Sequence, residues 1–269
     1  MPDITQTYAV QEASTALVTG ATSGIGKAIA LGFAKNNLAI AINGFGKEEE
    51  IAAVLAELKA AGAREAVHIP SDMSKTADIE QLISSTQKRL GSLDVLVNNA
   101  GIQYTANVED FPADKWDQII AINLSSAFHT TRLALPMMKE RNFGRIINIA
   151  SVHGLVASVQ KAAYVAAKHG IIGLTKVVAL ECAQQNITAN SVCPGWVLTP
   201  LVEAQVAANA AKDGISYEQA VEKLLLEKQP SLRFVGLEEL AALCLFLVSP
   251  GASSITGASM PIDGGWTAR

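Results

Sequence analysis

Thr15-Ala-Leu-Val-Thr19-Gly20-Ala-Thr-Ser-Gly24-Ile-Gly26 is the stretch that decides the fold of this chain. An apolar run of strand length passes through a glycine-rich turn into a segment with helical spacing over 26–36. Glycines let a backbone approach a pyrophosphate closely, and the start of a helix offers free N–H donors. The spacing is GxxxGxG rather than GxGxxG, and a glycine turn alone is a weak signal. Its place after the first predicted strand favours a dinucleotide site over an ordinary strand-to-helix turn.

Strand-like and helix-like segments alternate along the rest of the chain. Further strands are predicted at 38–42, 66–70, 94–98, 145–150 and 188–192. Helices are predicted at 48–61, 78–90, 116–140 and 163–184, with an apolar core helix at 240–248 in a final helix–strand unit. Buried strands that alternate with helices predict a doubly wound parallel sheet of the Rossmann type, an α/β fold with helices on both faces.

An alanine-rich helical stretch at 201–226 interrupts this alternation and is broken near Asp213-Gly214. It follows the sixth predicted strand, and ligands of open α/β sheets bind outside the carboxyl ends of the strands. The insertion is therefore placed to act as a lid. A helix pair that merely packs against the domain is an equally good interpretation.

Size and composition predict one large domain. The chain has 269 residues, of which 49% are hydrophobic and 17% charged, enough for a sizeable core. We expect residues 14–269 to form a single dinucleotide-binding and catalytic domain after a tail, 1–13, that has no assigned role. The net charge is -4, and no basic run with interleaved aromatic residues indicates a nucleic-acid partner.

The same sequence predicts a soluble, cytoplasmic protein without a membrane partner. The three cysteines are scattered and form no CxxC pair, which predicts buried thiols in a reducing compartment. The first residues lack the basic start and apolar core of a signal peptide. The apolar stretch at 240–248 is about half of the ~20 residues that a membrane span needs. No His, Cys, Asp or Glu cluster has metal-ligand spacing.

Tyr164 and Lys168 stand four residues apart in a predicted helix and so share one face. An unperturbed phenol has a pKa of about 10, and a neighbouring ammonium lowers it. Ser151, a short way upstream, can hydrogen-bond the oxygen on which the proton moves. Together the three groups predict proton transfer to or from a substrate alcohol. The spacing alone also fits two helical side chains with unrelated roles.

The end of the second predicted strand bears on the choice of dinucleotide. Ile42-Asn43-Gly44-Phe45-Gly46-Lys47 offers no Asp or Glu for the ribose hydroxyls and no Arg for a 2′-phosphate. Asn43 and Phe45 favour NAD, while Lys47 leaves NADP open. Asp72, after the third strand, either accepts from the adenine amino group or caps a helix.

These motifs, in this order and spacing, resemble the short-chain dehydrogenase/reductase family. They are the glycine turn 19–26, Asn98-Asn99-Ala100-Gly101, Asn123, Ser151, Tyr164-xxx-Lys168 and Pro194-Gly195, and they span nearly the whole chain. The resemblance implies a nicotinamide cofactor and a homotetramer. It makes Tyr164 the acid/base, aided by Lys168, with Ser151 orienting the carbonyl and Asn123 supporting a proton relay through water. It implies cofactor contacts from Gly20, Thr22, Ser23, Gly24, Ile25, Gly26, Phe45, Asp72, Asn99, Gly101, Tyr164, Lys168, Pro194, Val197 and Thr199.

Within the family, the chain is similar to the group of bacterial D-3-hydroxybutyrate dehydrogenases. The similarity lies in residues 43–46, 99–103, 149–154, 195–200, 227–231 and 263–266. It implies NAD and the reversible oxidation of (R)-3-hydroxybutyrate to acetoacetate. It implies substrate contacts from Gln103, Ser151, His153, Lys161, Tyr164, Trp196, Gln205 and Trp266.

Two positions agree with such a substrate without the resemblance. Lys161 precedes Tyr164 by three residues, and His153 follows Ser151 by two, so a cation and an imidazole flank the reacting groups. Charge-assisted hydrogen bonds would anchor a carboxylate there. The alternatives are a solvated surface lysine and a loop histidine bonded to backbone. The remaining histidines, at 68, 129 and 169, are interpreted as structural.

Three other functions stay open at this point. An NADPH-dependent 3-oxoacyl carrier-protein reductase and a sugar-acid dehydrogenase are two of them, since both would share the family motifs. A dinucleotide-binding scaffold without catalysis is the third, although the chain keeps all four catalytic positions.

Overall fold

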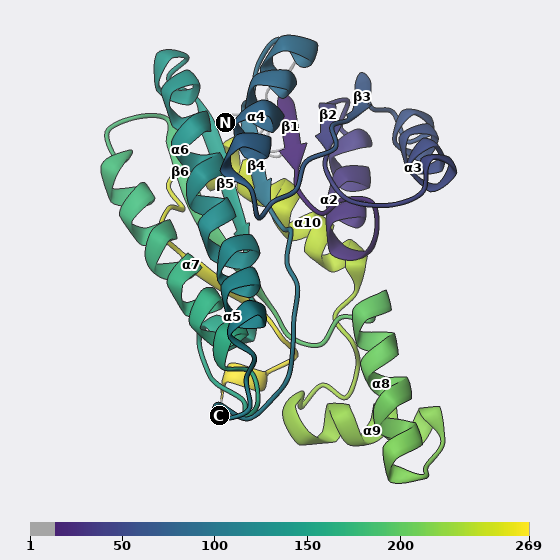
Figure 1. Cartoon of the computed structure of the whole chain (residues 1–269). Coiled ribbons are helices and arrows are strands. Elements are labelled where there is room, and N and C mark those ends of the chain that lie inside the picture. The colour runs from purple at the N-terminus through teal and green to yellow at the C-terminus, as the bar shows by residue number, and fades with distance from the viewer. Residues whose placement is uncertain (1–13, 269) are drawn as a thin grey trace, which may run out of the picture.

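Seven parallel strands form one sheet, in the order β3-β2-β1-β4-β5-β6-β7, in the computed structural model, which describes residues 14–268 (Figure 1). The strands are β1 (Thr15–Val18), β2 (Ala39–Ile42), β3 (Glu65–His68), β4 (Val95–Asn98), β5 (Gly144–Ile149), β6 (Ile187–Pro194) and β7 (Ser259–Ile262). Every residue of β1, β2, β4, β5 and β6 is buried, as expected for the strands of a parallel sheet covered on both faces. The predicted doubly wound sheet is confirmed.

Helices cover both faces of this sheet. On one face lie α2 (Gly24–Ala34), α3 (Glu48–Ala60) and α10 (Leu237–Val248). On the other lie α4 (Thr76–Leu90), α6 (Ser126–Glu140) and α7 (Ala162–Glu181), with α5 (Ala113–Ile120) beside α7. Phe33 and Leu58 pack with Ile40 on the first face, and Leu82 and Met138 pack on the second. Burial of each such side chain contributes roughly 1.5–3 kcal/mol.

The prediction of one uninterrupted helix at 116–140 is wrong. The helical segment starts at Ala113, and a π-helical turn, Ala121–Ser125, separates α5 from α6. A π-turn accommodates an extra residue and often occurs at functional sites. Here it contains Asn123. The other predicted elements are present with shifted ends.

The helical insertion is confirmed as a hairpin of α8 (Pro200–Asp213) and α9 (Tyr217–Lys228). Gly214, with a φ of 64°, ends α8 in the left-handed conformation. The hairpin has its own apolar cluster, which includes Val206 and Leu224. It projects from the carboxyl edge of the sheet (Figure 1). Its motion as a lid stays a prediction.

One helix of the described part, α7, is long and apolar enough to cross a membrane by length and composition. It packs against β6, β5 and α5 and carries Tyr164 and Lys168, as a core helix of this fold does. The apolar stretch at 240–248 belongs to the shorter helix α10. The predicted burial of Cys182, Cys193 and Cys244 is confirmed, and all three thiols are free. The predicted tail lies outside the described residues.

Candidate active site

A continuous crevice opens at the carboxyl ends of the strands, beside the point where the strand order reverses between β1 and β4. It consists of two adjoining pockets, one at the glycine turn and one between α7 and the loop after β6. Both are lined by Ile25, Asn99, Gly101, Ile102 and Thr199. A ligand bound at the glycine turn can therefore extend to the predicted catalytic residues.

The glycine turn is shaped for close approach. Gly20 has a φ of 61°, which favours glycine. A Cβ on Gly26 would lie 2.4 Å from the carbonyl oxygen of Gly20 and 2.5 Å from Nδ2 of Asn99. Ser23, the N-cap of α2, makes no side-chain cap, so the N–H groups of the first helical turn face the crevice without that partner. These features fit a pyrophosphate.

Asn99 and Thr19 tie this turn to the end of β4. Nδ2 of Asn99 donates to the carbonyl oxygens of Thr19 and Gly20, both at 2.9 Å. Oγ1 of Thr19 accepts from the N–H groups of Asn99 and Ala100, both at 3.0 Å. The predicted cofactor residue Asn99 thus holds the glycine turn in place through hydrogen bonds to its backbone.

The end of β2 presents an apolar side chain to the crevice. Phe45 lines it and is 77% exposed. The side chain of Asn43, which also lines this pocket, is tied to the neighbouring loop, since Nδ2 donates to the carbonyl oxygen of Ser71 at 3.0 Å. Thr22 holds the turn by donating to the carbonyl oxygen of Phe45 at 2.8 Å. Lys47 does not line either pocket.

Asp72 lines the cofactor pocket, as predicted. Oδ1 accepts from the N–H of Ser74 at 3.0 Å and from its hydroxyl at 2.7 Å, and these bonds lower the pKa of the carboxyl group. The alternative that Asp72 is a helix N-cap is wrong, because Lys75 has that position in α4. Asp72 stabilises the turn before the helix instead.

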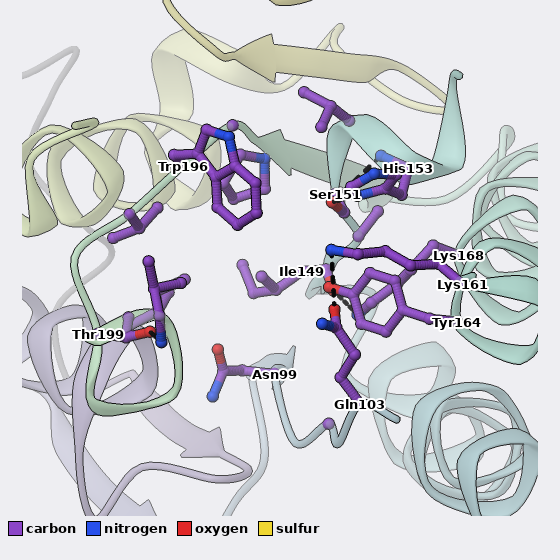
Figure 2. Close-up of a pocket in the computed structure, with 18 of the residues that line it drawn as sticks. Asn99, Gln103, Ile149, Ser151, His153, Lys161, Tyr164, Lys168, Trp196 and Thr199 are labelled. Carbon is purple, nitrogen blue, oxygen red and sulfur yellow. Dashed lines mark hydrogen bonds between the residues drawn. The ribbon is translucent and has the colours of Figure 1, made fainter. Parts of the chain in front are cut away.

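Tyr164 and Lys168 point into the same pocket from α7 (Figure 2). Nζ of Lys168 lies 5.6 Å from the centroid of the Tyr164 ring and donates to the carbonyl oxygen of Ile149 at 2.6 Å. The predicted shared face is confirmed. The predicted lowering of the phenol pKa is wrong for this structure. Burial raises the pKa of Tyr164, and the hydrogen bond with Ser151 offsets only part of this. Burial also lowers the pKa of Lys168 to about 8.

Asn123 does not line the pocket. Its side chain is 2% exposed and is occupied by the backbone of Ile102, with Oδ1 accepting from the N–H and Nδ2 donating to the carbonyl oxygen, both at 2.9 Å. The amide group therefore anchors the loop after β4. Its part in a proton relay stays a prediction.

Lys161 is buried at the end of the pocket and only 8% exposed. Nζ lies 5.1 Å from the centroid of the Trp196 ring and 3.5 Å from Oε1 of Gln103 (Figure 2). Lys161 is the N-cap residue of α7, so its side chain approaches from the helix entrance. Burial lowers its pKa to about 8. The alternative of a solvated surface lysine is wrong.

His153 is 4% exposed, and both of its ring nitrogens are engaged. Nε2 lies 2.9 Å from Oγ of Ser158, and Nδ1 lies 3.4 Å from Oγ of Ser151. Burial, and then the charge of Lys161, lowers the pKa of His153 to about 3, so the ring is neutral. The alternative of a loop histidine bonded to backbone is wrong, because the partners of both ring nitrogens are serine hydroxyls. Sequence reasoning missed Ser158, whose only signal was its proximity to His153 in the chain.

Two tryptophans, Trp196 and Trp266, line the substrate pocket. The rings of Trp196 and Trp266 lie 5.7 Å apart, and Trp266 meets His153 edge-on at 5.4 Å. The backbone N–H of Trp196 donates to Oε1 of Gln229 at 2.7 Å. Gln229, fully buried, was not predicted as a site residue, although it lies within the similar stretch 227–231.

The structure brings nearly all predicted site residues to this crevice. The substrate pocket, of about 170 Å³, is lined by Gln103, Ser151, His153, Lys161, Tyr164, Trp196, Gln205 and Trp266, all of the predicted substrate residues. Of the predicted cofactor residues, Gly20, Thr22, Ser23, Gly24, Ile25, Phe45, Asp72, Asn99, Gly101, Tyr164, Lys168, Pro194, Val197 and Thr199 line the crevice, and Gly26 packs beneath it.

The histidines interpreted as structural lie outside both pockets. His68 bonds the carbonyl oxygen of Gly44, and His169 bonds that of Val165. Among residues 14–268, no group of three or more His, Cys, Asp or Glu side chains could hold a metal ion.

Comparison with known proteins identifies the family. A family model described as short chain dehydrogenase matches residues 14–210. The chain belongs to this family of oxidoreductases, which bind a nicotinamide dinucleotide and act on small molecules. It is 58% identical to a D-beta-hydroxybutyrate dehydrogenase of Cupriavidus necator, with 95% of this chain and 98% of the relative covered. It is 51% identical to a protein of the same name from Rhizobium meliloti, with 95% and 99% covered.

A solved structure supports the fold independently. The crystal structure of a variant of the actinorhodin polyketide ketoreductase with NADPH has a TM-score of 0.90 and 37% sequence identity. The match covers 97% of this chain and 100% of that one.

Proposed function

We propose that this chain catalyses the reversible NAD-dependent oxidation of (R)-3-hydroxybutyrate to acetoacetate. The observation that carries the proposal is the buried Lys161 ammonium, which shares one small pocket with Ser151, Tyr164 and Lys168. A buried cation needs an anionic partner, and a carboxylate a few atoms from the reacting carbon supplies one. The high identity to two D-beta-hydroxybutyrate dehydrogenases favours the same substrate.

In the proposed mechanism Tyr164 exchanges a proton with the oxygen on C3. During reduction the neutral phenol donates this proton, and the raised pKa keeps it in that form. During oxidation the phenolate accepts it, and the nearby Lys168 ammonium stabilises that anion. Ser151 hydrogen-bonds the same substrate oxygen. A nicotinamide dinucleotide bound along the crevice would supply the hydride chemistry at C3.

Lys161 and Gln103 hold the other end of the substrate. Two anchored points fix which face of C3 meets the cofactor, and this gives the preference for the R enantiomer. The pocket of about 170 Å³ is smaller than the roughly 300–1,000 Å³ that drug-sized ligands occupy, which favours a short acid. His153, Trp196 and Trp266 enclose the chain, and Gln205 reaches the pocket from α8.

NAD is proposed over NADP because the end of β2 offers no cation within the crevice. Phe45 lines it there, while Lys47 lies outside. We further propose a homotetramer in the cytoplasm and a single domain over 14–269. The exposed apolar side chains of Phe128, Val177 and Leu180 on α6 and α7 support association, and light scattering would measure the mass.

The proposed lid role of α8 and α9 is supported by their separate apolar cluster and by Val202 and Gln205, which line the pocket. Amide exchange across 200–228 should slow when NADH and acetoacetate are added. Unchanged exchange would favour a helix pair that only packs.

An absorbance assay of reduced nicotinamide tests the function. We expect turnover with (R)-3-hydroxybutyrate and NAD, little with the S enantiomer, and little with NADP. Preference for NADPH with carrier-bound 3-oxoacyl substrates, or for sugar acids, would contradict the proposal. Cofactor binding without turnover of any of them would indicate a scaffold.

A further inference from the structure

The loop that carries Gln103 has no regular secondary structure over 99–107, so its position depends on a few hydrogen bonds. On one side of Gln103, Asn123 holds both backbone groups of Ile102. On the other side, the N–H of Ala106 donates to the carbonyl oxygen of Gln160 at 3.1 Å. Gln103 is thus held between two anchors that belong to different parts of the chain.

The second anchor, Gln160, has an unusual backbone. Its φ is 63°, a left-handed conformation that residues other than glycine rarely adopt and that Asn adopts more readily than most. Such a conformation persists only where surrounding contacts stabilise it. One of those contacts comes from the side chain, since Nε2 of Gln160 donates to Oδ1 of Asn107 at 3.2 Å. Main chain and side chain of Gln160 therefore bind the same loop.

The next residue along the chain is Lys161, at the entrance to α7. Its Nζ lies 3.5 Å from Oε1 of Gln103. Lys161 and Gln103 thus approach one another inside the pocket, while Gln160 joins the two segments that carry them outside it. Gln160 is exposed and does not line the pocket. Its contacts act on the site through the backbone of its neighbours.

We propose that Gln160 is a positioning residue for the acid-binding end of the pocket. Its left-handed backbone and its bonds to Ala106 and Asn107 hold the side chains of Gln103 and Lys161 next to one another, so that both can contact one carboxylate. This inference rests on the proposed function, in which those two side chains hold the acid group of the substrate.

The test compares a charged and an uncharged substrate with the same ketone. Reduction of acetoacetate and of methyl acetoacetate by NADH is measured for Gln160→Val and Gln160→Asn. Valine disfavours the positive φ and cannot bond Asn107. Gln160→Val should raise the KM for acetoacetate about tenfold, as expected when one charge-assisted contact is misplaced. Its kcat, and its KM for the ester, should stay within about twofold of the parent.

Two further variants make the result specific. Gln160→Asn keeps a side-chain amide that can donate a hydrogen bond and tolerates the positive φ, so it should stay close to the parent enzyme. Val159→Ala, at a neighbouring side chain that is 88% exposed, serves as the matched control and should change neither KM. The unfolding midpoint of every variant is measured to confirm that each is folded.

Three outcomes would overturn the inference. They are an unchanged KM for acetoacetate in Gln160→Val, an equal rise of both KM values in that variant, and the same loss in Gln160→Asn. Lys161→Ala distinguishes these failures from failure of the proposed function. If Lys161→Ala raises the KM for acetoacetate but not the KM for the ester, only the proposed role of Gln160 is refuted. If Lys161→Ala changes the KM values for both substrates to the same extent, the assignment of the acid-binding site is wrong, and the proposed role of Gln160 is refuted as well.

Discussion

The two ends of the crevice are built in different ways. At the cofactor end, backbone groups and the absence of side chains shape the surface, with Gly20 at positive φ and Gly26 packed against the Gly20 carbonyl. At the acid end, buried side chains do this, and they come from separate segments. Gln103 follows β4, Lys161 enters α7, and Gln205 extends from α8.

This difference teaches how each end can change. A backbone cradle fails when any atom is added to it, whereas a side-chain anchor fails when its own group is removed. The cofactor end should therefore be sensitive to enlargement and the acid end to truncation. Tyr164, between them, should be needed for the chemical step rather than for binding at either end.

The largest effect is expected where the two ends meet. Tyr164→Phe should lower kcat by about 10²–10⁴, because the proton donor is removed. NADH binding, followed by fluorescence, should change little. Tyr217→Phe, at a partly exposed tyrosine outside the crevice, is the control. A Tyr164→Phe enzyme with near-parental kcat would show that another group moves the proton.

Truncation at the acid end should give the next largest effect. Lys161→Ala should raise the KM for acetoacetate by about 10- to 100-fold, since hydrogen bonds to charged groups contribute ~1.5–3 kcal/mol. The KM for NADH should stay close to that of the parent enzyme. Lys176→Ala, at an exposed lysine of the same helix, is the control. Steady-state kinetics with each substrate varied in turn would expose a general loss of structure, which would raise both constants.

Adding a side-chain atom at the cofactor end should give the third largest effect. Gly26→Ala places a Cβ within 2.5 Å of two groups and should cost about 1–3 kcal/mol, seen as about a tenfold rise in the KM for NADH or an equivalent loss of stability. Gly173→Ala is the matched control, because its Cβ would meet nothing within 4 Å in α7. Thermal unfolding and NADH titration measure both effects. Equal behaviour of the two variants would argue against the cradle.

The smallest effect is a pH dependence confined to the acid end. Burial lowers the pKa of Lys161 to about 8, so its ammonium is present at neutral pH and is lost as the pH rises through that value. Since kcat/KM reports the free enzyme, its ratio for acetoacetate over methyl acetoacetate should fall several-fold as pH rises above about 8. Lys168 affects both substrates and cancels in the ratio. A constant ratio would place the charge elsewhere.

Sequence predicted the two ends unequally. The glycine turn is a local pattern after a strand, so Gly20, Gly24 and Gly26 could be placed from the chain alone. The residues of the acid end gained their roles mainly from resemblance, because Gln103 and Lys161 are 58 positions apart and meet only through the fold.

What sequence could not give depends on packing. The π-helical turn that directs Asn123 to Ile102 has no local signal in the spacing of apolar residues. The raised pKa of Tyr164 follows from desolvation of the phenol in the folded chain, which four-residue spacing does not report. Ser158 acts through a bond to His153 that only the folded loop reveals.

The most direct test measures the Michaelis constants for NADH and for acetoacetate in the same two variants, Gly26→Ala and Lys161→Ala. The account predicts that the first variant raises chiefly the constant for NADH and the second chiefly that for acetoacetate. If both variants raised both constants to the same extent, the division of the crevice into a backbone-built cofactor end and a side-chain-built acid end would be contradicted.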